Sequence, residues 1–542
     1  MRAIRMIGSA SLLLTAAACQ DLLVENLTDP DISRVFGTPS SIEAVIGAGY
    51  QTIHNATANQ ALWPETQMLG LETYSSLNNF NMGVRVSIPR NPLSNGIGSP
   101  SFFTEFSSTT RAARLMFNAL DAHAKLMKEN GTLGTPAQNL RARSFAFFNA
   151  GTALAWTAMI YDSAAVLGLN MTIDSLPPLV TAAAVMSVAI TYLDSALVYA
   201  SDPAASGDGG FPLPARWLGS DENAPLKADQ FQRLIRSMRA RFRAGVARTP
   251  AQRDAVDWQK IIEDTEGGLQ KDFLVNTGGT TGWNVGDLTQ IYVDPGWGQM
   301  SMMYWGMADT SGAYRTFIAA QVNQRNGMFL VLTPDKRWPA GTTRGAQRTS
   351  SVQPTSVTSK PYISNRSVAD VAGDGWGVSY YDFYRFKYIR NNKNIGLYPE
   401  FMKAENDLLA AEAYIRTGDF AKAAAKIDLT RVTNGGLPAL TNVITNATDP
   451  VPGGTACVPQ VPNAGTVSCG TILEAMKYEK RIETAYSSFG RWWIDSRGWG
   501  DLIEGTAYEY PVPYQEMQAR KTKYYPLGGG FGSSAGKSTY GF

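Results

Sequence analysis

The chain has 542 residues, of which 44% are hydrophobic and 17% are charged. Its 48 Lys and Arg residues nearly balance its 46 Asp and Glu residues, which leaves a formal net charge of +2. This hydrophobic content excludes a disordered chain, and the near-neutral charge argues against a nucleic-acid partner. The two histidines leave little room for a histidine-based metal site or catalytic triad. Composition therefore points away from most enzymes, and we expect neither a cofactor nor a metal.

Residues 1–18 have the features of an export signal. Arg2 and Arg5 precede an apolar run that is too short to span a bilayer. Three alanines then lead into Cys19. The pattern is similar to a bacterial lipoprotein signal, in which the cysteine is acylated, for example with palmitate, and becomes the mature N-terminus. An ordinary secretory signal with an incidental cysteine is the alternative, because Ala16 stands where such signals usually have Leu.

The remaining cysteines, Cys457 and Cys469, flank a loop that contains Pro and Gly. An even pair across such a loop in an exported protein favours a disulfide. Two unlinked thiols are the alternative. A zinc site is disfavoured because no histidine lies nearby.

Turn and breaker residues divide the mature chain into regions. Residues 19–37 are interpreted as a lipidated tether and 38–275 as a helical region. Residues 276–400, where Gly, Asn and aromatic residues crowd together, are interpreted as an irregular region of ligand-binding loops. Helical pattern returns in 401–526, and the Gly- and Ser-rich residues 527–542 are predicted to be a flexible tail. We expect helices at 40–50, 101–129, 138–161, 181–200, 227–248, 255–271, 400–432 and 471–487.

Two stretches that lack charged residues, 145–161 and 176–193, are candidates for membrane-spanning helices. The first carries several polar residues and the second opens with a Leu-Pro-Pro sequence. Neither supplies the roughly 20 strongly apolar residues that a span needs. Both are therefore interpreted as buried helices of a large helical core.

One helix pair has the spacing of a tetratricopeptide hairpin. In residues 411–428 the first helix is predicted to end at Gly418 and the second to begin near Phe420. The small side chains of Ala413 and Ala423 would let the two helices approach closely. Residues 239–262 suggest a second, interrupted copy, and such units stack into a solenoid. The predicted fold class is mainly α, a tetratricopeptide-like solenoid with a large irregular insertion rich in aromatic residues and glycine.

The order of these landmarks resembles the SusD/RagB family of outer-membrane nutrient-binding lipoproteins. The acidic leader after Cys19, the helix at 139–162 and the helices at 185–200 and 238–247 follow the family order. Residues 472–500 resemble its charged C-terminal block, and 511–517 resemble its closing Pro-x-Pro segment. The resemblance spans most of residues 19–526. It implies a lipid-anchored, surface-exposed protein of the outer membrane that acts as a lid on a TonB-dependent, SusC-like transporter.

The charged C-terminal block contains Glu479, Arg481, Glu483, Arg491, Asp495 and Arg497 among three tryptophans. Arginine–carboxylate pairs sheltered by aromatic rings would pin this helix against the helical repeats. We favour that structural role over a catalytic carboxylate pair, because no nucleophile motif accompanies the block. Asp370 and Asp374 are interpreted as part of a solvated turn rather than as calcium ligands.

Aromatic residues in the Gly-rich middle are the candidate ligand-binding residues. A ring held on a loop between glycines, as at Trp297, can present a flat face on which a sugar stacks. The family resemblance implies ligand loops in this region and in an N-terminal loop near Asn78 and Asn79. The candidates are Trp63, Tyr74, Trp283, Tyr292, Trp297 and Trp305.

From these residues and the resemblance we expect a non-catalytic protein that captures an oligomeric nutrient and passes it to the transporter. An oligosaccharide is favoured as the ligand. A peptide is the first alternative, because RagB-type members suggest it, and an exported glycosidase is the second. A purely structural lipoprotein would be indicated if the aromatic cluster were buried.

Overall fold

The computed structural model describes residues 38–58, 62–75, 77, 81–96, 134–166, 171, 176–221, 224–280, 282–284, 297–366, 379–463, 465–487, 489–530, 532 and 535–542. Several predictions fall outside these residues. They concern the export signal and Cys19, the helix at 101–129, Asn78, Asn79, Tyr292, Asp370 and Asp374.

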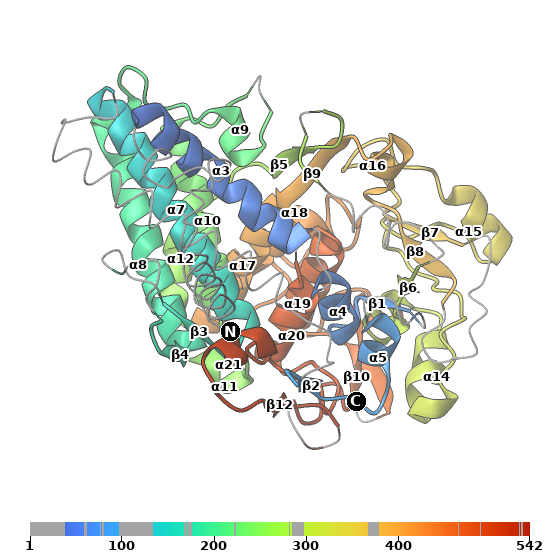
Figure 1. Cartoon of the computed structure of the whole chain (residues 1–542). Coiled ribbons are helices and arrows are strands. Elements are labelled where there is room, and N and C mark those ends of the chain that lie inside the picture. The colour runs from blue at the N-terminus through green and yellow to red at the C-terminus, as the bar shows by residue number, and fades with distance from the viewer. Residues whose placement is uncertain are drawn as a thin grey trace, which may run out of the picture.

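Long helices form one side of the molecule (Figure 1). They are α3 (Pro39–Ala58), α7 (Pro136–Ile160), α8 (Ala182–Ser201) and α10 (Ala228–Gly245). Helix α7 packs against the other three and is buried on nearly all sides. Its start is fixed by a capping box between Thr135 and Gln138. Gly151 lets α8 approach closely, since a Cβ there would lie 2.9 Å from the Ala189 carbonyl oxygen.

Helix α8 is the one described helix that is long and apolar enough to cross a membrane by length and composition alone. It lies along α7 and α10, and 33% of its apolar window is buried. The interpretation of 145–161 as a buried helix is confirmed by α7. The second run, 176–193, includes the first part of α8, which is buried on its inner face only.

The predicted helical hairpin is confirmed. Helix α17 (Lys403–Thr417) ends at Gly418, whose φ of 83° is the left-handed conformation that ends many helices. Asp419 then caps α18 (Phe420–Arg431) by accepting a hydrogen bond from the Lys422 backbone.

The second unit is also present. Helix α10 is followed by the short α11 (Pro250–Asp254) and by α12 (Trp258–Glu266), which packs on both α10 and α17. Apolar side chains of α10, α12 and α17 form a single buried cluster. The chain is therefore mainly helical, with stacked helix pairs as expected.

The C-terminal charged block forms α19 (Ile472–Thr484) and α20 (Arg491–Trp499), which lie in the centre of the molecule (Figure 1). Arg491 reaches Glu405 of α17 at 3.0 Å, and Arg241 of α10 binds the same carboxylate through two nitrogens at 2.8 and 2.7 Å. Burial alone would raise the pKa of Glu405, but these guanidinium groups hold it at about 2. The structural role predicted for this block is confirmed, because its charges join the last helices to the helical repeats.

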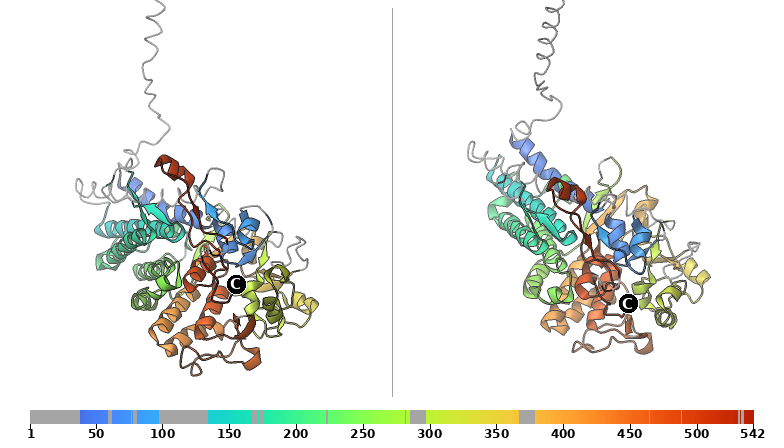
Figure 2. Two further views of the ribbon diagram at one scale, coloured as in Figure 1. Left: turned by 90° about the horizontal axis from the view of Figure 1, so that it is seen from below. Right: turned by 60° about the horizontal axis from the view of Figure 1, so that its bottom comes forward.

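Short elements make up the other side of the molecule, which the two views in Figure 2 show beside the helical side. The described strands form two-stranded antiparallel sheets. These are β1 (Thr73–Tyr74) with β6 (Gln299–Met300), β2 (Leu93–Ser94) with β12 (Pro526–Leu527), β3 (Ser163–Ala165) with β4 (Leu179–Thr181), β5 (Phe273–Thr277) with β9 (Gly396–Phe401), β7 (Ile363–Asn365) with β8 (Tyr381–Phe383), and β10 (Gln460–Asn463) with β11 (Thr466–Cys469).

Helices of eight residues or fewer connect these strands. They are α4 (Leu62–Leu69), α5 (Met82–Val86), α9 (Ala215–Leu218), α13 (Met302–Trp305), α14 (Ala313–Ala319), α15 (Arg344–Ser350), α16 (Lys387–Asn391) and α21 (Tyr514–Ala519). No described helix between residues 276 and 400 is longer than seven residues. The irregular character predicted for this region is therefore confirmed.

The predicted tail is not flexible at its described end. Tyr540 and Phe542 are buried, and the Tyr540 hydroxyl donates a hydrogen bond to Glu474 at 2.6 Å. The Phe542 ring lies 5.9 Å from that of Tyr304. The prediction was wrong because the many glycines and serines of the tail hid two aromatic residues that pack on the core.

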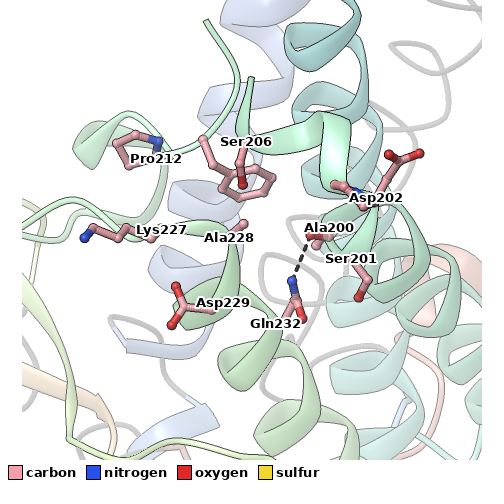
Figure 3. Close-up of a pocket in the computed structure, with 11 residues that line it drawn as sticks. Ala200, Ser201, Asp202, Ser206, Pro212, Lys227, Ala228, Asp229 and Gln232 are labelled. Atoms are coloured by element: carbon pink, nitrogen blue, oxygen red, sulfur yellow. Dashed lines mark hydrogen bonds between the residues drawn. The ribbon is translucent and has the colours of Figure 1, made fainter. Parts of the chain in front are cut away.

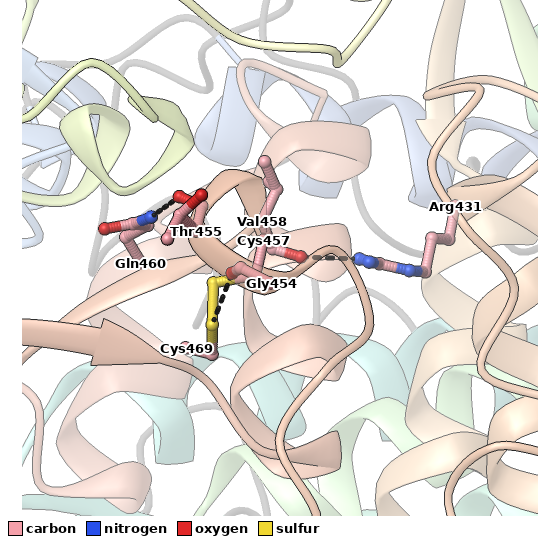
Figure 4. Close-up of a disulfide and its surroundings, with 7 residues drawn as sticks. All are labelled: Arg431, Gly454, Thr455, Cys457, Val458, Gln460 and Cys469. Atoms are coloured by element: carbon pink, nitrogen blue, oxygen red, sulfur yellow. Dashed lines mark hydrogen bonds between the residues drawn. A yellow bond between two sulfur atoms is a disulfide. The ribbon is translucent and has the colours of Figure 1, made fainter.

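Cys457 and Cys469 form a disulfide at the base of the β10–β11 hairpin (Figure 4). Arg431 of α18 donates a hydrogen bond to the Val458 carbonyl at 2.8 Å, which attaches this hairpin to the helical hairpin.

Non-reducing peptide mapping should recover one fragment that contains both Cys457 and Cys469. The double variant Cys457→Ser/Cys469→Ser should unfold more easily, by about 2–4 kcal/mol, since the link restricts the unfolded chain. Thermal melts of the wild type with and without reductant provide the control. Alkylation of both thiols without reductant would show that the bond does not form.

Candidate functional site

Four of the six candidate aromatic residues are buried. Trp63 and Tyr74 are 1% exposed, Trp305 is 2% exposed and Trp283 is 5% exposed. Tyr292 lies outside the described residues. Trp297 is half-buried and packs against the edge of the core. Whether any of these residues binds a ligand stays a prediction.

Each buried ring has distant partners that explain its position. The Trp305 ring centre lies 4.8 Å from that of Trp492, and its Nε1 donates to the Glu72 carbonyl at 2.8 Å. Trp283 lies 5.1 Å from the His54 ring, beside Gly219, where a Cβ would come within 2.7 Å of the indole. These contacts hold both tryptophans in the core beside the irregular region.

The structure brings the N-terminal and central loop regions together at Trp297. Strand β1 pairs with β6, so that Tyr74 lies opposite Gln299. The Ser75 hydroxyl donates to the Trp297 carbonyl at 2.6 Å. Gly298 permits this contact, because a Cβ there would lie 2.8 Å from Cγ2 of Thr73.

Residues that follow β7 and precede β8 also contact this part of the molecule, through Gln299. The Gln299 side-chain oxygen accepts hydrogen bonds from Arg366 Nη1 at 2.7 Å and from the Ser379 backbone at 3.0 Å. Arg366 follows β7 and also pairs with Asp382 of β8 at 3.4 Å. Strands β1, β6, β7 and β8 therefore gather in one part of the molecule (Figure 1).

We call this place the loop base. It consists of Tyr74, Ser75, Trp297, Gly298, Gln299, Arg366 and Ser379. The chain segments that adjoin it, at 76–80, 285–296 and 367–378, lie wholly or largely outside the described residues. Sequence reasoning selected Tyr74 and Trp297 but missed Gln299, Arg366 and Ser379, which carry no motif. The loop base can place segments from three parts of the chain around one half-buried indole.

The start of the central loop region is held by a buried histidine. His54 of α3 is fully buried, with Nδ1 2.8 Å from Glu400 Oε2 and Nε2 2.9 Å from the Asn284 carbonyl. Both partners are hydrogen-bond acceptors, so only a doubly protonated ring satisfies both. Burial lowers the pKa of His54, but Glu400 and the two hydrogen bonds outweigh burial and raise it above the ordinary 6.5.

Stability should depend on pH through this pair. A raised His54 pKa stabilises the fold below pH 6.5 and the effect disappears as pH rises through the folded-state value. The Glu400 pKa is lowered from 4.5, because His54 and Arg241 outweigh its burial, so its contribution disappears as pH falls below 4.5. The stability difference between wild type and His54→Gln should therefore be larger at pH 6 than at pH 9 in urea titrations. An equal difference at both values would show that the ring is neutral.

The surface has pockets of different chemistry. One, of about 450 Å³, lies where α8 ends and α10 begins (Figure 3), and there Gln232 Nε2 donates to the Ala200 carbonyl at 2.9 Å. A second, of about 440 Å³, has an apolar floor that includes Leu226 and Phe273. A third, of about 530 Å³, lies between α15 and β7. Among the described residues, no group of His, Cys, Asp or Glu is placed to hold a metal ion.

The fold of this chain is similar to that of several solved structures. A scan of protein-family models found no match, and a search of curated proteins found none. Among solved structures, a candidate sugar-binding protein from Bacteroides vulgatus aligns with 90% of this chain and 98% of its own, at 13% identity and a TM-score of 0.54. A SusD superfamily protein from Bacteroides thetaiotaomicron aligns over the same shares, at 12% identity and a TM-score of 0.52.

A SusD homolog from Parabacteroides distasonis aligns with 87% of each chain, at 13% identity and a TM-score of 0.50. These alignments extend over most of the helical and irregular parts together. At such identities the likeness concerns architecture. The chain therefore has the helical, tetratricopeptide-like fold of the SusD superfamily proteins.

Proposed function

We propose that this protein belongs to the SusD/RagB family and captures an oligosaccharide at the outer membrane without breaking a bond. It would deliver the ligand to a TonB-dependent, SusC-like transporter. The observation that carries the proposal is a fold shared over about nine-tenths of the chain with SusD superfamily proteins, one of which is a candidate sugar-binding protein.

The chemistry of the loop base supports a sugar ligand. Trp297 is the candidate ring there that is not fully buried, and an indole face suits the apolar face of a pyranose. Arg366 donates a hydrogen bond to the Gln299 side chain, and this bond holds the neighbouring backbone in place. A base that is held rigid by such hydrogen bonds reduces the ordering that ligand binding requires.

One cluster of three carboxylates lies away from the pockets. Asp335, Glu479 and Glu483 lie together, but their side chains are fully buried and all three bind Arg337. None of them lines the three pockets described above. Acid–base work on a glycosidic bond needs carboxyl groups that reach the substrate, so these groups serve the fold.

Isothermal titration against matched panels of oligosaccharides and peptides tests the ligand class. Binding of at least one oligosaccharide is expected, with weak to moderate affinity because the ligand must be released to the transporter. Binding of peptides alone would favour the RagB-type alternative. Co-purification of a barrel transporter with the tagged, lipidated protein in detergent tests the partner.

Cys19→Ala should release the protein from the membrane. Acyl chains supply the membrane affinity of a lipoprotein, so the variant should remain an uncleaved precursor or become soluble. Fractionation of cells after a high-salt wash, with the wild type as the control, measures the effect. A variant that stays in the outer-membrane fraction would contradict lipid anchoring.

A further inference from the structure

Positive charge is concentrated in one part of the irregular region. From Asp335 to Pro399 the sequence carries ten Lys and Arg residues and four Asp residues, whereas the whole chain has a net charge of +2. Asp335 and Asp382 are buried in ion pairs with Arg337 and Arg366, at 2.7 and 3.4 Å, so these pairs add no charge to the surface. Arg385 is also buried, and seven Lys and Arg residues of the stretch remain partly or fully exposed. The other two acids of this stretch lie outside the described residues.

The pocket between α15 and β7 lies in this positive stretch. Its volume is about 530 Å³, and its lining combines Arg348 and the Tyr384 ring with glycine, hydroxyl and amide residues. The lining contains neither a carboxylate nor an aliphatic side chain. Lys387 adds a second positive charge close by, since its Nζ lies 3.9 Å over the Tyr384 ring.

Part of the lining is engaged in holding the pocket wall. The Asn365 backbone donates to the Ser351 hydroxyl at 3.0 Å, and the Asn365 side chain donates to Gln347 at 3.0 Å. These contacts attach β7 to α15. The wall is therefore fixed before any ligand arrives.

Three other side chains of the lining have polar groups that are free to bind a ligand. Within the part of the chain that the structure describes, the Arg348 guanidinium forms no ion pair or hydrogen bond, and neither the Ser364 nor the Tyr384 hydroxyl forms a hydrogen bond. Ser364 is only 6% exposed and Tyr384 only 8%. Hydroxyl groups with unused hydrogen-bonding capacity on a pocket wall are suited to a polar ligand.

We propose that this pocket binds an acidic sugar residue, one that carries a carboxylate or a sulfate group, through Arg348. The guanidinium would bind the anionic group with two parallel hydrogen bonds. The Ser364 and Tyr384 hydroxyls would bind the ring hydroxyls. The inference rests on the proposed capture of oligosaccharides and specifies their class. A peptide is less suited, because the pocket has no aliphatic wall for its apolar side chains.

The pocket and the loop base are joined through the backbone at the end of β7. Asn365 lines the pocket, and the next residue, Arg366, binds Gln299 of the loop base at 2.7 Å. Arg344 of α15 also donates to the Arg366 carbonyl at 3.1 Å.

Oligogalacturonate and its fully methyl-esterified form are paired probes, since esterification removes the charge of each carboxyl group and adds only a methyl group. The wild type should bind the free acid about tenfold more tightly than the ester. Arg348→Gln should weaken binding of the free acid about tenfold and leave the ester unchanged. Arg315→Gln is the control, because Arg315 of α14 is exposed and has no ion pair among the described residues.

The outcomes separate this inference from the proposed function. Equal binding of acid and ester by the wild type, or an acid preference that survives Arg348→Gln, would overturn the inference and leave oligosaccharide capture standing. Binding of oligoglutamate as tight as that of the free acid, and equally dependent on Arg348, would overturn it in favour of an acidic peptide. Binding of peptides but of no saccharide would overturn both proposals.

Discussion

Replacing Arg337 with alanine should lower the free energy of unfolding by about 3–5 kcal/mol. Arg337 contacts Asp335, Glu479 and Glu483 at 2.7, 2.7 and 2.9 Å, and all four side chains are 0% exposed. Without the guanidinium, three carboxyl groups would face one another in the core with no cation among them. Urea titration followed by tryptophan fluorescence measures the loss.

The loss of stability in Arg337→Ala should depend on pH. Burial raises the pKa of Glu479, and Arg337 is the strongest influence that opposes burial. In Arg337→Ala the pKa should rise further, so that the folded state keeps a proton that the unfolded state releases. Such a group stabilises at low pH and loses its contribution as pH increases. The deficit relative to wild type should therefore be smaller at pH 5.5 than at pH 8.

Two variants define the cause. Arg337→Lys should recover only part of the stability, because an ammonium group cannot reproduce the planar, forked hydrogen bonds to several carboxylates. Arg315→Ala, at an exposed position, should change stability little. If Arg337→Ala unfolds at the wild-type urea concentration at pH 8, the buried cluster does not determine stability.

Local signals in the sequence were sufficient to predict most long helices. The turn between α17 and α18 follows from Gly418 and Asp419. Helix α7, expected at 138–161, begins at Pro136, where Thr135 and Gln138 form a capping box. These signals act within a few residues, so they need no knowledge of the fold. The order of such elements along the chain also carried the resemblance to SusD proteins.

Contacts between distant residues could not be predicted in the same way. His54 and Glu400 are 346 residues apart in the sequence, and Glu405 and Arg491 are 86 apart. A charged block in the sequence indicates pairing but does not name the partners. Likewise Arg366 and Gln299 meet only because β7 and β6 reach the same place.

The aromatic residues illustrate a second limit. A tryptophan beside glycines has the same local pattern whether the glycine exposes the ring or admits it into the core. At Trp283 it is the distant Gly219, in a left-handed conformation at φ 61°, that makes room for the indole. Exposure is decided by such remote partners, and so the local pattern did not distinguish the four buried candidates from Trp297.

Trp305→Ala and Trp297→Ala should have opposite effects on stability and binding. Trp305 is 2% exposed and packs on Trp492 and Phe383 at 4.8 and 5.5 Å between ring centres. Its removal leaves a cavity and should lower the free energy of unfolding by about 3–5 kcal/mol. Trp297 is half-buried at the edge of the core, so its removal should cost less stability.

For ligand binding the order should reverse. If Trp297 stacks on a sugar, Trp297→Ala should weaken oligosaccharide binding by roughly 1–3 kcal/mol, as for other aromatic platforms. Trp305→Ala, assayed well below its melting temperature, should bind nearly as the wild type does, because no face of its ring is open to a ligand. Thermal melts and titration of the same preparations measure both quantities.

A large fall in melting temperature for Trp297→Ala with unchanged binding would place that ring in the core and remove it from the site. Such a result would leave the fold and the α15–β7 pocket untouched, because neither depends on that indole. Weakened binding with a nearly unchanged melting temperature would instead assign Trp297 to the ligand. Because Ser75 and Gly298 fix its backbone, Ser75→Ala should then weaken binding as well, by less than removal of the ring itself.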